Sequence, residues 1–276
     1  MIVFKYLPIE RVDVIRDLKI RFTQLSSLND YYETYHSLDM RRDFEIQLQS
    51  SLDELDELWG QLNPIEQAEN KSDYENAIIE VKGHFDKANQ ELVMTQEITN
   101  ILDKTLGILS LSQSNSDLLM WSHYSDSYCG YVIAFDSEHE FFHKKDLNGR
   151  VTHPIHVEYT ENKPLIKLGS LDTFKQIIGT KASKWCYEQE VRLTINFLGL
   201  NPLTDNDNGP ILDDFGNKIY LIDIPKDAIK AVYLGPRVSD KTKTDICESL
   251  KKNQIECPVY QGVLSGEIHS LIFDEI

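Results

Sequence analysis

Long apolar stretches are missing from this sequence of 276 residues. The longest clean runs, such as Tyr131–Phe135, are far too short to cross a bilayer. The opening residues also lack the basic start, long apolar core and small-residue cleavage site of a secretory signal. These absences predict a soluble, cytoplasmic protein without a membrane partner.

Cysteine is scarce, and its spacing matches no common zinc-binding pattern. The sequence holds four cysteines and no CxxC pair: Cys129, Cys186, Cys247 and Cys257. We expect four reduced, mostly buried thiols. His153 and His156 make poor metal ligands together, because a spacing of three residues on a strand points the two side chains to opposite faces. The sequence therefore predicts no metal site.

Glycine-rich phosphate loops and several familiar catalytic motifs are absent. There is no GxGxxG, GxxxxGK[ST], HExxH or GxSxG, so several enzyme classes lose their best support. Basic residues are also outnumbered, with 28 Lys and Arg against 45 Asp and Glu and a net charge of −17. A broad nucleic-acid surface is not expected. A local positive pocket for a phosphate-rich small ligand remains compatible with this charge.

The residues that are present predict one α+β domain over 1–276 with an acidic insertion at 38–105. The insertion carries 16 acidic and 6 basic residues, a net charge of −10. Its apolar residues recur at three- and four-residue steps, which predicts two long amphipathic helices and hence an antiparallel hairpin. They are Phe44, Leu48, Leu52, Leu55 and Trp59, and then Tyr74, Ile78, Val81, Phe85, Ala88 and Leu92.

Asn63-Pro64 should separate these two helices, and Ser72 or Asp73 should cap the second, which is predicted to run to about Lys104. The hairpin would be either a structural lid or a docking arm for a protein regulator.

Outside the insertion, strands alternate with short helices. The strands are predicted at 2–6, 19–23, 107–112, 130–136, 153–160, 191–197, 218–224, 231–235, 255–261 and 270–273, and the helices at 12–18, 117–125, 170–183 and 239–252.

The segment MWSHYS, residues 120–125, gathers aromatic and hydrogen-bonding side chains. One interpretation is a helix whose aromatic residues face the core. The other is a pocket wall, in which Trp121 and Tyr124 stack on a flat ring while Ser122 and His123 orient it by hydrogen bonds.

A second cluster runs from Trp185 to Arg192. Glu188, Glu190 and Arg192 would share one face of a strand. The cluster is either an ion pair on an exposed edge strand, which would add little stability, or a carboxylate site for developing positive charge, with Trp185 excluding water.

The third region lies in the first two strands, where Lys5-Tyr6 and Arg21-Phe22 place cations beside aromatic residues. These are either ordinary surface charges or a local phosphate clamp.

Together these segments resemble a bacterial family of proteins of unassigned function. The segments that carry the resemblance are Lys5-Tyr6, Arg21-Phe22-Thr23 followed by Asn29-Asp30, Leu109–Ser112, Met120–Tyr124, Gly130–Asp136 and Trp185–Arg192, with Ala231–Ser239 in the C-terminal half. That family is distantly similar to the ADP-ribosyltransferase fold. The resemblance implies a mixed or antiparallel β core with short helices, into which the helical hairpin is inserted.

The same resemblance implies an enzyme that uses NAD to modify a macromolecular acceptor, in the manner of a toxin or a phage-defence effector. Glu190 would be the catalytic glutamate that stabilises the oxocarbenium-like state, Glu188 would orient or deprotonate the acceptor, and Tyr124 would belong to the central motif. The implied NAD-binding residues are Lys5, Tyr6, Arg21, Trp121, Ser122, His123, Trp185 and Arg192. Lys5 stands where better-known members of the fold have histidine, and a clear Ser-Thr-Ser motif is absent.

Two other functions stay open at this point. The chain could be a non-enzymatic nucleotide sensor that uses the same pocket, with the hairpin reporting that the nucleotide is bound. It could also be a metal-dependent nuclease or other hydrolase, for which the pair Glu188 and Glu190 is the best candidate.

Overall fold

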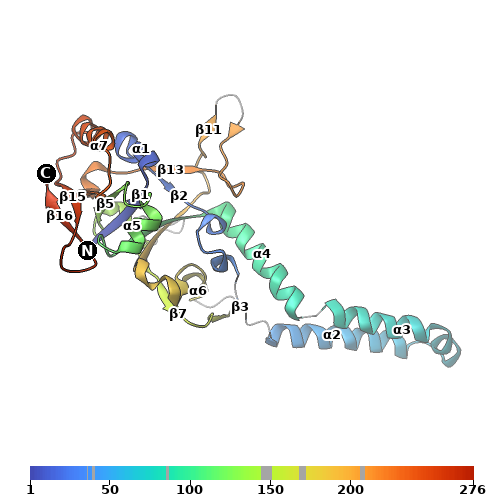
Figure 1. Ribbon diagram of the computed structural model, residues 1–276. Coiled ribbons are helices and arrows are strands. Elements are labelled where there is room, and N and C mark those ends of the chain that lie inside the picture. The colour runs from blue at the N-terminus through green and yellow to red at the C-terminus, as the bar shows by residue number, and fades with distance from the viewer. Residues whose placement is uncertain (36, 39–40, 85–86, 144–150, 168–171, 206–208) are drawn as a thin grey trace.

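A mostly antiparallel sheet forms the centre of the protein (Figure 1). The computed structural model describes residues 1–35, 37–38, 41–84, 87–143, 151–167, 172–205 and 209–276. The central sheet has eight strands in the order β16-β15-β14-β5-β1-β4-β10-β6, and only β14 and β15 pair in parallel. These strands are β1 (Ile2–Leu7), β4 (Leu106–Ser112), β5 (Tyr131–Asp136), β6 (Ile155–His156), β10 (Glu190–Asn196), β14 (Ile229–Leu234), β15 (Val259–Leu264) and β16 (Leu271–Glu275). The predicted α+β class is confirmed.

Short helices cover both faces of this sheet. On one face, α1 (Asp13–Asp17) and α7 (Asp240–Lys252) share a core with alternate residues of β5, including Ile133 and Phe135. On the opposite face, α5 (Leu118–Tyr124) packs with Val132, which lies between those two residues in the strand. The alternation of apolar side chains along β5 therefore places one helix layer on each side (Figure 1).

Smaller paired strands and short helical turns surround the central sheet. The pairs are β2 (Lys19–Phe22) with β13 (Tyr220–Asp223), β3 (Ser37–Leu38) with β8 (Leu165–Ile166), β7 (Glu158–Thr160) with β9 (Thr180–Ala182), and β11 (Thr204–Asp205) with β12 (Gly209–Pro210). The remaining elements are α6 (Thr173–Ile178) and the 3-10 helices η1 (Ile9–Arg11), η2 (Leu25–Ser27), η3 (Tyr31–Thr34), η4 (Glu140–Phe142), η5 (Ser183–Glu188) and η6 (Lys226–Ala228).

The acidic insertion contains three helices where the sequence predicts two. They are α2 (Arg41–Gly60), α3 (Pro64–His84) and α4 (Lys87–Thr105). The predicted cap at Ser72 or Asp73 is wrong, because α3 already begins at Pro64. Asn63 caps it instead: its side-chain oxygen accepts hydrogen bonds from the backbone N–H groups of Ile65 and Glu66.

The second predicted helix is divided between α3 and α4, and the position where they meet, residues 85–86, is outside the described residues. The predicted helix-face residue Phe85 therefore lies outside the description, as do the side chains of Phe44, Ala88 and Leu92.

Two further boundaries differ from the prediction. The expected strand over 153–160 is divided at Val157, where the chain changes partner. The Val157 N–H still donates to the Glu190 carbonyl of β10, whereas the Glu158 N–H donates to the Gly179 carbonyl next to β9. The expected helix over 170–183 is much shorter, because it ends at Gly179 and the chain continues as β9; residues 170–171 lie outside the described part. The thiols also differ, since Cys186 is exposed and the other three are half-buried, so the expectation of mostly buried cysteines is wrong.

Close backbone packing fixes the connection from α5 to β5. A Cβ on Gly130 would lie 2.2 Å from the Leu7 carbonyl oxygen, and one on Gly235 would lie 2.1 Å from the Tyr128 carbonyl oxygen. Only glycine permits this approach. The C-terminal end of α5, which carries Tyr124, is thereby held against β1.

Among the described helices, none combines the length and the apolar character that crossing a bilayer requires.

Candidate functional site

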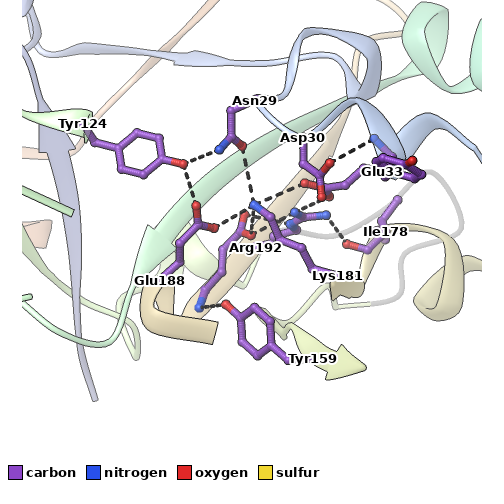
Figure 2. Close-up of polar contacts among 11 residues, drawn as sticks. Asn29, Asp30, Glu33, Tyr124, Tyr159, Ile178, Lys181, Glu188 and Arg192 are labelled. Carbon is purple, nitrogen blue, oxygen red and sulfur yellow. Dashed lines mark hydrogen bonds and ion pairs between the residues drawn. The ribbon is translucent and has the colours of Figure 1, made fainter. Parts of the chain in front are cut away.

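A buried cluster of charged side chains lies at the β10 end of the central sheet (Figure 2). Its centre is Lys181 of β9, whose Nζ is 2.7 Å from Glu188 Oε2 and 3.4 Å from Glu190 Oε2. The same Nζ is 3.3 Å from Glu33 Oε1. With Arg192, these residues form what we call the charge cluster. All five are almost completely shielded from solvent.

Arg192 is the second cation of the cluster and has no solvent exposure. Its Nε and Nη2 donate to the two carboxylate oxygens of Glu190 at 2.8 and 2.9 Å. Nη2 also pairs with Glu33, and Nη1 donates to the Ile178 carbonyl at 2.7 Å. This bidentate arrangement uses the planar fork of the guanidinium and fixes the Glu190 carboxylate in one orientation.

The local sequence explains why these charges share a buried face. Val191 and Leu193 of β10 point into the core beneath α1 and α7, so Glu190 and Arg192 point to the opposite face. The expected exposed edge strand is therefore not what forms, because β10 lies between β4 and β6. Gln189 has a φ of 44°, and this left-handed residue separates η5 from β10.

The segment before and within η3 closes the cluster. Asp30 caps η3 by accepting from the backbone N–H of Tyr32 at 3.0 Å. Glu33 then reaches Lys181 and Arg192, while the Asn29 side-chain amide donates to the Tyr124 hydroxyl. That hydroxyl in turn donates to Glu188 Oε1 at 2.5 Å. One short segment therefore connects α5 with both cations.

Two cavities border the cluster. The smaller, of about 70 Å³, is lined by Phe4, Lys5, Tyr6, Asn29, Ser110, Leu111, Ser112, Met120, Tyr124, Lys181, Glu188 and Glu190. The larger, of about 310 Å³, has mostly apolar walls and includes Tyr32, Glu33, Tyr35, Ile177 and Lys181. Lys181 contributes to both, so a ligand in either cavity meets a member of the charge cluster.

The pKa values of Glu190 and Glu33 shift in opposite directions. Burial raises the pKa of Glu190, but the charges of Arg192 and Lys181 and the hydrogen bonds from Arg192 and Ser110 outweigh it and lower that pKa to about 2. In Glu33, burial dominates over the same two cations and leaves the pKa above its ordinary value. Glu190 therefore stays ionised throughout the physiological pH range.

Two groups next to these carboxylates stay protonated and act as hydrogen-bond donors. Burial lowers the pKa of Lys181, but Glu190, Glu33 and Glu188 together raise it above its ordinary value. Burial and the hydrogen bond to Glu188 raise the pKa of the Tyr124 hydroxyl. Both groups keep their protons at neutral pH and can donate hydrogen bonds to a ligand or to Glu188.

Lys5 gives the site a measurable pH dependence. Burial lowers the pKa of its ammonium from 10.5 to about 8, against the attraction of Glu190. Between these two values the native state binds fewer protons than the unfolded chain, so stability from this group rises with pH. We expect the free energy of unfolding of the wild type, relative to Lys5→Met, to rise by up to about 1.4 kcal/mol per pH unit above pH 8.

Urea denaturation at several pH values measures this difference, with the exposed Lys184→Met as the control. A difference between wild type and Lys5→Met that does not change with pH would contradict the assigned environment of Lys5.

The structure brings several of the predicted residues together. Lys5, Tyr6, Tyr124, Glu188 and Glu190 line the smaller cavity, and Arg192 lies directly behind Glu190. Trp185 is close by, with its ring centroid 5.0 Å from Lys181 Nζ.

Other predicted residues lie elsewhere. Trp121 is fully buried among core residues, and its indole N–H donates to the Asn115 carbonyl, so its ring is not free to stack on a ligand. Arg21 is paired with Asp213 and does not form a phosphate clamp at the cavity. Ser122 and His123 follow Trp121 on α5 but do not line either cavity described above.

Sequence reasoning missed Lys181 and Glu33 and gave Asn29 no role. Lys181 stands alone in the strand TKA, and Glu33 lies among the tyrosines of YYETY. Neither has a local motif. The only signal in the sequence is weak. Each residue is a single charge in an otherwise apolar or aromatic segment, and such a charge needs a partner when the segment is buried.

The match to known families covers part of the chain. Residues 120–193, about a quarter of the sequence, match a family described as a protein of unknown function (DUF2971). This segment runs from α5 to β10 and contains Tyr124, Lys181, Glu188, Glu190 and Arg192. Searches for similar curated proteins and for similar solved structures each returned no significant match. The match thus supports a domain of unknown function, which includes most of the charge cluster.

Proposed function

We propose that the protein is an ADP-ribosyltransferase-like enzyme that uses NAD to modify a macromolecular acceptor. One observation carries this proposal: two carboxylates, Glu188 and Glu190, line a cavity with Lys5 and Tyr124. These residues follow the order along the chain that the family resemblance implies, with a first-strand cation, a central hydroxyl motif and a late Glu-x-Glu.

The environment of Glu190 suits a residue that faces positive charge. Its pKa of about 2 keeps it ionised throughout the physiological range. Cleavage of the nicotinamide–ribose bond develops positive charge on the ribose, and a fixed carboxylate in a buried site stabilises that charge more than it stabilises the ground state. Ser110 of β4 lines the same cavity and helps to keep the pKa of Glu190 low, although no Ser-Thr-Ser motif is present.

Glu188 is the better placed of the two to handle an acceptor. Its Oε1 accepts from the Tyr124 hydroxyl and its Oε2 from Lys181, but unlike Glu190 it pairs with no guanidinium in the part of the chain that the structure describes. We assign it the task of orienting or deprotonating the acceptor nucleophile. The smaller cavity has room for only a few water molecules, so we place ribose hydroxyls there and leave the rest of the dinucleotide to the larger cavity beside Lys181.

Nicotinamide release from NAD tests this proposal. We expect the purified chain to release nicotinamide, faster with cell lysate as a source of acceptor, and Glu190→Gln to lower the rate by about 100-fold or more. Glu158→Gln, an exposed glutamate on β7, is the matched control and should keep full activity. Equal rates in wild type and Glu190→Gln would refute the assignment of Glu190.

A nucleotide sensor is the second candidate, and one observation favours it. Both Glu190 oxygens are already held by Arg192, and Lys181 is 3.4 Å from one of them. This pairing offsets the negative charge that catalysis would need. Binding of NAD or ADP-ribose without nicotinamide release, unchanged in Glu190→Gln, would select the sensor.

The metal-dependent hydrolase has less support from the geometry. Lys181 Nζ lies among the three carboxylates, where a divalent cation would have to sit. Within the described ranges, no group of three or more His, Cys, Asp or Glu side chains is arranged to hold a metal ion.

A further inference from the structure

Helices α2 and α3 form an arm that projects away from the rest of the protein (Figure 1). We use the word arm for residues 41–84. The two helices pack antiparallel on each other, and over the described ranges neither makes extensive contact with any other element. The arm therefore contributes little to the stability of the central core or of the charge cluster. We look for its function on its own surface.

The seam between the two helices is incompletely buried. It contains the stacked rings of Trp59 and Tyr74, whose centroids are 4.3 Å apart, with Leu52, Leu55 and Ile78 nearby in the helical repeat. All five are only half-buried, and α3 contains no buried residue. Two helices alone cannot cover both sides of an apolar seam, whereas a third helix laid along it would bury these side chains.

The exposed surface of the arm also carries apolar side chains that a partner would cover. Leu58 is 61% exposed, and Ile65 and Ile79 are 72% and 67% exposed. Leu58 follows Leu55 by three residues on α2 and so borders the seam, where a third helix would cover it.

Charge decides which occupant fits. The arm has eleven acidic and four basic residues, a net charge of −7. A nucleic acid, an anionic membrane surface or a second acidic arm would each be repelled. A partner helix with an apolar stripe flanked by lysine and arginine would cover the apolar seam and pair with the acidic residues around it.

We propose that the arm is a docking site for a basic amphipathic helix of a partner protein, which packs along the seam as a third helix. The seam supplies the apolar contacts. Glu45 and Asp56 of α2 border the seam, because Glu45 precedes Leu48 by three residues and Asp56 follows Leu52 by four, and we expect them to face the basic flanks of the partner. This inference is independent of the proposed catalytic function, because it involves none of the residues at the charge cluster.

A model peptide tests the docking site on the full chain. The probe is a fluorescently labelled peptide of leucine and lysine with the leucines at helical spacing, about as long as α2 and α3, which have 20 and 21 residues. We expect saturable binding by fluorescence anisotropy that weakens when salt is raised from about 50 to about 300 mM. Glu45→Lys combined with Asp56→Lys should weaken binding at least tenfold.

The controls separate docking from simple attraction to an acidic protein. Glu248→Lys combined with Glu267→Lys makes the same charge change at exposed positions outside the arm and should leave binding unchanged. Circular dichroism should show that the Glu45/Asp56 variant keeps its helices. Equal weakening by both variants, or equal binding of a peptide with the same composition in scrambled order, would overturn the proposal. So would a dimer of the chain alone in sedimentation that the added peptide dissociates, because a second copy would then cover the seam.

Discussion

Replacement of Arg192 by methionine is expected to lower the free energy of unfolding by about 3–5 kcal/mol. Arg192 has no solvent exposure, and it pairs with both Glu190 and Glu33. Its removal leaves these two carboxylates buried with Lys181 as their remaining cationic partner. Because an unpaired charge in a buried site is far more costly than a lost surface pair, the effect should be among the largest of any single substitution. Urea denaturation measures it.

The matched control is Arg16→Met, which removes an exposed pair with Asp17. Such a pair contributes little, so its loss should change the free energy of unfolding by less than about 1 kcal/mol. Adding Glu190→Met to Arg192→Met removes one of the stranded carboxylates and should restore part of the stability. Equal effects of Arg192→Met and Arg16→Met would show that the charge cluster does not stabilise the fold.

Replacement of Lys181 by methionine is expected to make stability strongly dependent on pH. Three carboxylates would then lie close together with Arg192 as the main positive charge, so repulsion should raise the pKa of at least one of them. A carboxyl group whose native pKa exceeds its unfolded value contributes stability below the unfolded pKa, and that stability is lost as the pH rises through the native pKa. We expect a loss of about 3–5 kcal/mol near pH 8 and a smaller loss near pH 5.

Unfolding in urea at both pH values, for wild type and variant, gives the comparison. Lys184→Met serves as the control, because Lys184 is exposed and only three residues away. Its effect should be small at both pH values. A loss in Lys181→Met that is equal at pH 5 and pH 8 would contradict the role of Lys181 as the shared partner of the carboxylates.

Much of the fold could be predicted from the sequence, because most helices and strands have a recognisable local pattern of apolar and capping residues. The short helix at 12–18, the strands at 2–6 and 130–136, and the capped helix at 239–252 correspond to α1, β1, β5 and α7. Ser239 caps α7 by accepting a hydrogen bond from the backbone N–H of Thr242. Interruptions were harder to predict, because the strand over 153–160 divides where it changes partner from β10 to β9, and both partners come later in the chain.

Only part of the candidate site could be predicted from the sequence. Glu188, Glu190 and Arg192 drew attention because three charges alternate within five residues at a predicted strand. Lys181 and Glu33 have no such pattern, and they matter because the fold brings them into contact with each other and with the rest of the charge cluster. Trp121 shows the reverse error, since an aromatic residue in a polar motif turned out to serve the core. Local pattern identifies groups that need partners, but it does not reveal which partners they find.

The assembly of the charge cluster from distant segments has a consequence for how the chain folds. Glu33 comes from η3, Lys181 from β9 and Arg192 from β10, so no single hairpin can form the cluster. A partly folded state that buried one of these charges before its partner arrived would be unfavourable. The cluster should therefore close late, after the strands around it have paired. Interactions that form late act mainly on the rate of unfolding, so the cluster lengthens the lifetime of the native state more than it hastens its formation.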